Sequence, residues 1–274
     1  ALARRLRATA REPGSLLAHL ATSPFAALVA GVVYFDVDDR LTGIQNRAGL
    51  FFASVLYHAL GGLSAVADAS LGGESFERRE VASGVVPAAI AALSAAASDA
   101  LCLRFLPAAL FAPVLALMAD LAREPPEQTV LHAWLVYALV GISSASVARA
   151  ARRALGPGGG GELLAVVSVS LSAVFGGLLT RAGSASSATA DVLEAQESSY
   201  SYHAWAALMV SEFRALELLA FDPLGGAGTA FTGRAFLSAY GLDPDGAGTH
   251  LGALAGIAAA LVGLDVGVAV LWGR

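Results

Sequence analysis

Long apolar runs recur along this chain at near-regular intervals, and they constrain its fold more than any single motif does. Of the 274 residues, 56% are hydrophobic and 14% are charged, whereas a soluble domain carries roughly 25% charged residues. A bilayer core of about 30 Å is crossed by a helix of roughly 20 mostly apolar residues. The runs therefore predict an all-α, polytopic membrane protein.

We predict six transmembrane helices from these runs. They cover residues 16–35, 48–69, 93–121, 130–148, 163–179 and 250–272. Arginines in the short loops set the orientation, because cytoplasmic loops carry an excess of positive charge. One side holds Arg4, Arg5, Arg7, Arg11, Arg78, Arg79, Arg149, Arg152, Arg153 and Arg274, and the other side holds Arg40, Arg47 and Arg123. Both termini are therefore expected in the cytoplasm. The membrane that holds the protein is either the plasma membrane or an internal membrane.

Three further segments complete a single transmembrane domain over residues 1–274. Residues 1–14 are expected to form a cytoplasmic lead-in, and residues 72–86 a cytoplasmic segment with a short amphipathic helix. Residues 180–249, between the fifth and sixth helices, form a large extracytoplasmic segment in which residues 202–221 have a helical pattern. A loop of that length is rarely a mere linker. The glycine-rich turn 156–161 lacks the Lys-Ser/Thr pair of a phosphate-binding loop, so no nucleotide is expected there.

Charged side chains within the predicted spans are the main physical anomaly. They are Asp99, Arg104 and Asp265. An ionised group inside a span costs several kcal/mol and normally faces protein or water. Asp99 lies about 140° around an α-helix from Arg104, so it is not expected to be the partner of Arg104. Arg104 either joins a polar network that includes Asp265, or it extends to the cytoplasmic headgroups.

Several short motifs occur in order along the chain. They are Gly-Ile-Gln-Asn-Arg-Ala-Gly-Leu-Phe-Phe from Gly43, Phe-Glu-Arg-Arg-Glu from Phe76, Leu-Arg-Phe-Leu-Pro from Leu103, Phe-Gly-Gly-Leu-Leu from Phe175 and Ala-Leu-Met-Val-Ser-Glu-Phe from Ala207. Their order and spacing resemble the transmembrane domain of subfamily G of the ABC transporters, the White/pigment and multidrug half-transporters. The run from Gly43 is the most specific, and it is most similar to half-transporters that export drugs and lipids.

This resemblance implies an energy source outside the sequence. In that family a nucleotide-binding domain lies N-terminal to the membrane domain on the same polypeptide. The sequence has no Walker A, signature or Walker B motif, so ATP and Mg²⁺ are expected to bind in a domain that precedes Ala1. No cofactor or catalytic residue is expected in this chain.

The resemblance also implies a homodimer or heterodimer of half-transporters, embedded in membrane lipid, that works by alternating access. Hydrophobic small molecules, lipids or sterols are the expected cargo, and no nucleic-acid partner is expected. A non-transporting or regulatory dimerisation partner from the same family is the alternative.

Site residues follow from matching positions in the family. The expected substrate cavity is lined from the second helix by Phe52, Leu56, Tyr57 and Leu60, and from the fifth by Val166, Val167, Ser170 and Ala173. The expected gate is Leu178 and Leu179, and the expected coupling residues are Phe76, Arg78, Arg79 and Glu80. The alternatives are plain helix packing for the cavity stripes, a lipid-facing helix end for the gate, and a solvated loop for the coupling residues.

An intramembrane enzyme is the rival class of function. The sequence has no His-Glu-x-x-His, Gly-x-Gly-Asp or Gly-x-Ser-Gly motif. Its histidines are scattered without metal-ligand spacing, at His19, His58, His132, His203 and His250. A membrane peptidase is therefore not expected.

Overall fold

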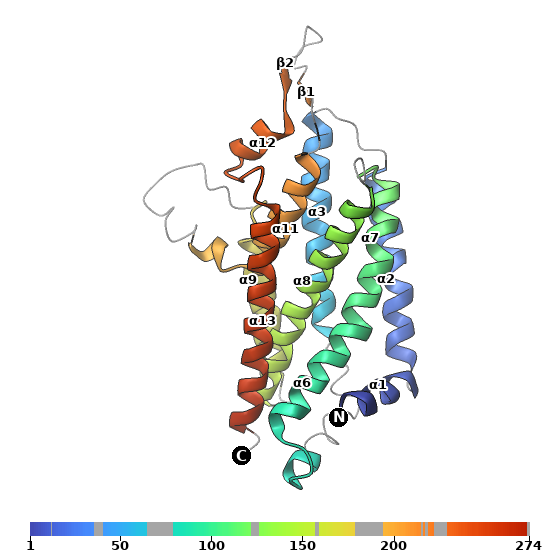
Figure 1. Ribbon diagram of the computed structural model, residues 1–274, viewed down its shortest axis with the longest axis vertical. Helices are drawn as coiled ribbons and strands as arrows, with labels where there is room; N and C mark the ends of the chain where they lie inside the picture. Colours follow the sequence, from blue (N-terminus) through green and yellow to red (C-terminus); the bar gives the residue numbers. More distant parts are fainter. Residues whose placement is uncertain are drawn as a thin grey trace.

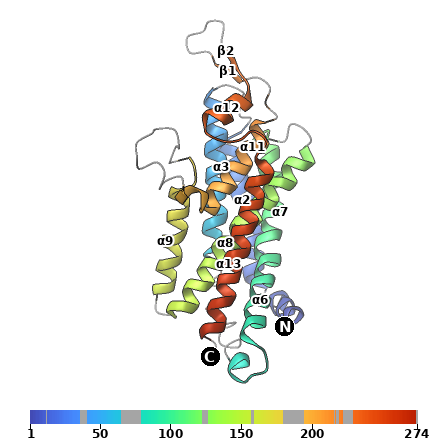
Figure 2. The ribbon, with the colours of Figure 1, turned by 60° about the vertical axis from the view of Figure 1, so that its left-hand side comes forward.

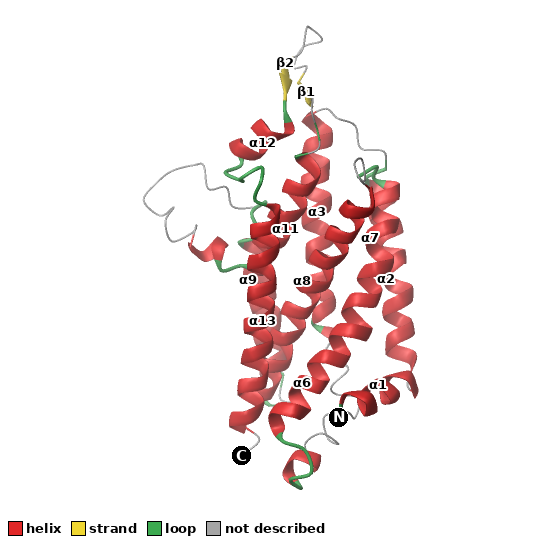
Figure 3. Cartoon of the chain, in the orientation of Figure 1, coloured by secondary structure: helices red, strands yellow, loops and turns green. Residues whose placement is uncertain are grey.

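The computed structural model describes residues 1–11, 13–35, 41–64, 79–121, 126–156, 159–178, 194–214, 216, 219–221 and 229–272. Helices dominate these residues, as Figure 3 shows. In chain order the elements are α1 (Leu2–Arg11), α2 (Pro13–Val33), α3 (Leu41–Gly62), α6 (Ala88–Asp99), η2 (Ala100–Phe105), α7 (Leu106–Met118), α8 (Pro126–Leu155), α9 (Gly160–Val174), α11 (Tyr200–Phe213), β1 (Leu219–Phe221), β2 (Thr229–Phe231), α12 (Gly233–Ala239) and α13 (Ala247–Trp272).

The long helices run side by side in an elongated bundle (Figure 1). Both chain ends lie at one end of the bundle, which we call the termini end, where α1 lies across the base. The opposite, hairpin end carries α12 and the antiparallel pair β1–β2. Figure 2 shows α9 standing at the margin of the bundle beside α8.

The helix α8 forms the centre of the packing, since it contacts α3, α9, α11 and α13. Large side chains fill the core around it, including Phe111, Tyr137 and Trp205, each of them almost inaccessible. Small residues let the backbones approach closely elsewhere. Gly62 in α3 lies so near Ser144 in α8 that a Cβ on the glycine would come within 1.8 Å of the serine Oγ.

The helices α6, η2 and α7 form one continuous helix with a π-helical segment in its middle. Pro107 follows this segment and has no N–H to donate to the carbonyl four residues earlier, so the α-helical register cannot continue unbroken there. Two side chains satisfy carbonyls near this point: the Trp134 indole donates to the Phe105 carbonyl at 2.8 Å, and the Ser23 hydroxyl donates to the Pro107 carbonyl at 2.7 Å.

Four helices of the described residues are long and apolar enough to cross a membrane: Gly14–Val33, Ala88–Met118, Gln128–Leu155 and Ala247–Leu271. These four helices support the prediction of a helical, multi-pass membrane protein. Helices also occupy most of the other two predicted spans, as α3 and α9. However, α9 has only 15 residues, and α3 contains the polar run Gln45, Asn46 and Arg47 within its first two turns.

Several predicted boundaries are wrong. The helix α8 continues to Leu155, so Arg149, Arg152 and Arg153 lie in a helix and not in a loop. The helix α3 begins at Leu41 and places Arg47 inside it, fully buried, instead of in an outer loop. The helix predicted over residues 202–221 is also too long, because α11 ends at Phe213 and residues 219–221 form a strand.

Candidate functional site

A chain of buried ion pairs joins three helices in the part of the bundle toward the termini end. Its first link is between Arg104 in η2 and Asp99 at the end of α6, where Nη2 lies 2.8 Å from Oδ1. The prediction that Asp99 could not be this partner is wrong. It assumed α-helical geometry, whereas the wider turn of a π-helix brings residues five apart onto one face.

Arg104 also fixes the end of α3. Its Nη1 donates at 2.7 Å to the Gly61 carbonyl, one of the last carbonyls of that helix, which also accepts from the Ser64 hydroxyl at 2.8 Å. The guanidinium side chain passes close to Gly141 of α8, where a Cβ would meet the Arg104 Cδ at 3.1 Å. Only 3% of the Arg104 side chain is exposed. Arg104 therefore belongs to a polar network, and it does not extend to the headgroups.

Asp265 in α13 belongs to the same set of ion pairs, but its partners are Arg149 and Arg153 and not Arg104. Its Oδ2 accepts from the Arg149 Nε at 3.0 Å, and its Oδ1 pairs with Arg153 one helical turn further along α8. Arg149 also donates to Asp99 at 2.8 Å, which closes the chain across α6, α8 and α13. Sequence reasoning placed Arg149 and Arg153 in a loop and therefore missed both.

The charges in this chain nearly balance. Three guanidinium groups and two carboxylates leave a net charge of +1 on the five side chains. Asp265 is fully buried, so its negative charge is tolerated only because both oxygens have cationic partners. The arrangement is suited to holding helices in a fixed register, because removal of either carboxylate leaves buried arginines without a compensating charge.

The predicted cavity stripes lie at the surface of this single chain. On α3, Phe52 and Leu56 are half-buried and Leu60 is exposed, whereas Tyr57 turns inward to stack on Phe111 with ring centroids 5.4 Å apart. On α9 the exposed residues include Val166, Val167 and Ser170, and Ala173 is half-buried. The two helices touch only slightly, so the structure does not bring the two stripes together within one chain.

The region of the predicted gate is packed tightly beneath α11. Leu178 is half-buried against the hydrophobic core, and Leu179 lies outside the described residues. Gly177 has a φ of +87°, and a Cβ there would come within 2.7 Å of the Trp205 ring. Glycine is therefore required by both backbone conformation and space.

Hydroxyl groups join the end of α9 to the start of α11. The Ser172 Oγ lies 3.0 Å from the Ser199 Oγ and 2.9 Å from the Ser201 Oγ. Burial raises the pKa of the neighbouring Tyr200 hydroxyl to about 12, so this group stays protonated near neutral pH.

The comparison with protein families gives one result. Residues 1–152 match the family described as ABC-2 type transporter. The chain belongs to this family. No curated protein matches the chain. The ABC-2 region runs from α1 through most of α8, and it therefore contains Asp99, Arg104 and Arg149 of the ion-pair chain.

As an ABC-2 type domain, this chain is the membrane part of an ABC-type transporter, and such domains typically pair with a nucleotide-binding domain and dimerise. Of the predicted coupling residues, Phe76 and Arg78 lie outside the described residues. Arg79 and Glu80 open a helical turn over residues 79–82 at the termini end. Glu80 pairs with Arg4 of α1 at 2.7 Å, which ties the lead-in helix to this turn.

A buried contact joins two of the sequence motifs of this ABC-2 chain. Arg47, from the Gly-Ile-Gln-Asn-Arg run in α3, lies 3.3 Å from Glu212, from the Ser-Glu-Phe run in α11. The Trp205 indole donates to the Ala48 carbonyl at 3.1 Å in the same interface. Both side chains of the ion pair are buried, and together with the Trp205 hydrogen bond they link α11 to the first half of α3. The two motifs are 165 residues apart (212 − 47), and no sequence pattern indicated this pairing.

Proposed function

We propose that this chain is the membrane domain of an ATP-driven exporter of subfamily G, which works as a dimer by alternating access. Its cargo is a hydrophobic small molecule, a lipid or a sterol. Its six helices α2, α3, α6–α7, α8, α9 and α13 span the membrane, with both termini in the cytoplasm. ATP and Mg²⁺ bind in a nucleotide-binding domain on the same polypeptide.

The observation that carries this proposal is the pair of apolar stripes left open on α3 and α9. Leu60 is 49% exposed, and Val166 and Val167 are each 45% exposed. A second copy that covers these stripes would enclose a cavity lined by Phe52, Leu56 and Val167 from both subunits. Such a lining has few polar groups, which suits an apolar cargo.

Engineered cysteines test the dimer interface. With Cys102→Ser as background, Val167→Cys is expected to form a disulfide-linked dimer under mild oxidation in membranes. Val169→Cys is the matched control, because this neighbour is only 1% exposed and packs inside the chain. Equal cross-linking of both variants, or of neither, would contradict an interface at α9.

Transport itself is tested with the protein that includes its nucleotide-binding domain, reconstituted in liposomes. We expect hydrophobic drugs, phospholipids or sterols to stimulate ATP hydrolysis, and Leu56→Arg to abolish the stimulation by placing a charge in the cavity. Normal dimerisation with no stimulation by any class would favour the alternative, a non-transporting dimerisation partner.

A further inference from the structure

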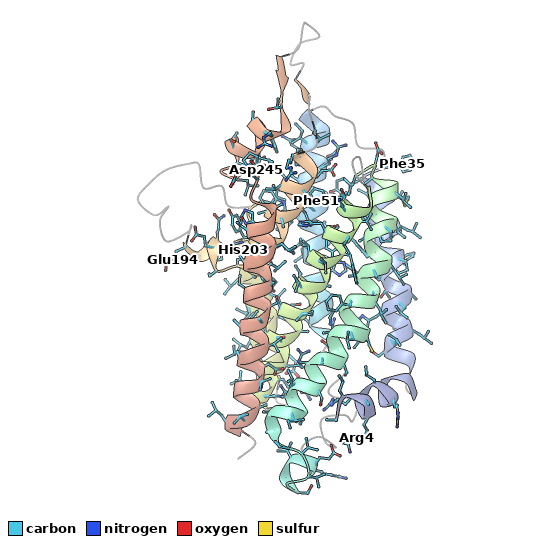
Figure 4. The ribbon with its side chains drawn as sticks, in the orientation of Figure 1. Arg4, Phe35, Phe51, Glu194, His203 and Asp245 are labelled. Carbon is cyan, nitrogen blue, oxygen red and sulfur yellow. The ribbon has the colours of Figure 1, made fainter. Side chains whose placement is uncertain are left out.

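Two histidines that lie 47 residues apart in sequence meet near the hairpin end of the bundle. His203 belongs to α11 and His250 to the first turn of α13, and Figure 4 shows His203 beside the upper part of α13. Their Nδ1 atoms are 3.1 Å apart. This contact links α11 to α13 through side chains, and it is separate from the ion-pair chain and from the predicted cavity and gate.

The hydrogen bonds around His203 define which of its nitrogens carries a proton. Its Nε2 lies 2.8 Å from the Glu197 carbonyl oxygen, which can only accept a hydrogen bond. The neutral ring therefore has its proton on Nε2 and a lone pair on Nδ1, directed at His250. A histidine that donates its other N–H to a carbonyl is the usual arrangement of a metal ligand, because that bond fixes the tautomer and orients the ring.

We propose that His203 and His250 form a binding site for a divalent transition metal ion, with Zn²⁺ as the probe. A Zn²⁺ ion about 2.05 Å from each Nδ1 would give an N–Zn–N angle of roughly 100° at the observed separation, close to tetrahedral. The ion takes the place of the one proton that the two nitrogens share.

Two carboxylates act on side chains at or beside this site. The negative charge of Asp243 acts on His250, and that of Glu197 acts on the adjacent Tyr202. His203 is buried and His250 is half-buried, so the site is partly closed but open to solvent on one side. Among the described residues no third His, Cys, Asp or Glu completes a set of three ligands. Water therefore fills the remaining coordination positions, as in zinc sites that keep an open position.

Metal binding would fasten α11 to α13. On its other side, α11 is already attached to α3 through Arg47–Glu212 and Trp205–Ala48. With the ion bound, α11 would be fixed to both neighbours, and it could not separate from α13 without losing a ligand.

The test is a metal titration of the protein purified without a polyhistidine tag, in lipid nanodiscs. We expect Zn²⁺ to raise the thermal unfolding midpoint by several degrees and equilibrium dialysis to find a single bound ion per chain, whereas Mg²⁺ has no effect. Binding should weaken as the pH is lowered, because protons compete with the ion for the imidazole nitrogens. The assay needs neither ATP nor cargo, so its outcome is independent of the proposed function.

His203→Gln and His250→Gln should each abolish the Zn²⁺-dependent shift and the bound ion. His19→Gln is the matched control, since this histidine contacts Ser64 in another part of the bundle, and it should leave both readouts unchanged. If a substitution itself lowers stability, dialysis at low temperature still reports binding. Absence of bound Zn²⁺ in the unsubstituted protein, or equal binding in all variants, would overturn the proposal.

Discussion

At the scale of single residues, the most consequential feature is Asp265, a carboxylate in the C-terminal third of the mostly apolar helix α13. It is fully buried, and its two oxygens are held by Arg149 and Arg153. An isolated charge at this depth would be costly, whereas a buried pair roughly offsets its own desolvation. Its value to the protein is therefore the register between α8 and α13 more than net stability.

Asp265→Asn should destabilise the protein strongly, by about 3–5 kcal/mol, because the two arginines remain buried with one carboxylate fewer. Thermal and denaturant unfolding of the purified protein would measure this. Asp245→Asn is the matched control: its partner is Arg234, both side chains are exposed, and the expected change is below about 1 kcal/mol. Similar losses in the two variants would show that burial does not decide the cost.

At the scale of elements, adjacent glycines at the end of α3 have different roles. Gly62 faces α8, and a Cβ there would lie 2.8 Å from both the Ala145 backbone nitrogen and the Ser144 Cβ. A Cβ at Gly61 would meet no atom within 4 Å, and the Gly61 carbonyl accepts hydrogen bonds from Arg104 and Ser64. The close approach of α3 and α8 therefore depends on one glycine and not on its neighbour.

Gly62→Ala should lower the unfolding midpoint clearly, since the backbone of α8 must shift to accommodate the methyl group; we expect a cost of about 1–3 kcal/mol. Gly61→Ala should be neutral or stabilising by up to about 1 kcal/mol, because alanine is the better helix former. Melting curves of the two variants side by side make the comparison. A larger loss at Gly61 than at Gly62 would contradict the packing described for this helix pair.

The contact between α1 and the turn at residues 79–82 is another feature of this scale. Its ion pair is partly exposed, so it contributes little to stability, typically below about 1 kcal/mol. If the turn couples the membrane domain to ATP hydrolysis, Arg4→Glu and Glu80→Arg should each reduce cargo-stimulated ATPase activity without changing the unfolding midpoint. The double exchange should restore activity, and its failure to do so would argue against a specific role for this pair.

At the scale of the whole molecule, both chain ends lie at one end of the bundle and α12 lies at the other (Figure 1). An impermeant thiol reagent applied to sealed vesicles tests this arrangement in a Cys102→Ser background. Ala3→Cys and Ala239→Cys should react from opposite sides of the membrane, and Ala3 from the cytoplasmic side. Ala258→Cys, which is buried, is the unreactive control. Labelling of both exposed positions from one side would exclude the proposed topology.

Much of the helical framework was predictable because apolar runs of membrane length report directly on helices. The boundaries were less accurate where polar residues lie inside helices, as at Arg47 and Arg149, because a charge count assigns such residues to loops. The π-helical turn was not predictable from the pattern around Arg104, and missing it led to the wrong exclusion of Asp99 as the partner of Arg104. The sequence motifs around Arg47 and Glu212 are visible in the sequence, but the contact between them is not.

The sequence by itself determined that this chain is a helical membrane domain, because hydropathy is a local property that each segment displays on its own. Tertiary structure alone decided which charges and imidazoles meet. Arg149 reaches Asp99 across 50 residues and Asp265 across 116, and His203 reaches His250 across 47. These separations correspond to no helical or strand period. The contacts exist because α6, α11 and α13 all pack on α8 or on one another, and that arrangement is set by the fit of whole helices.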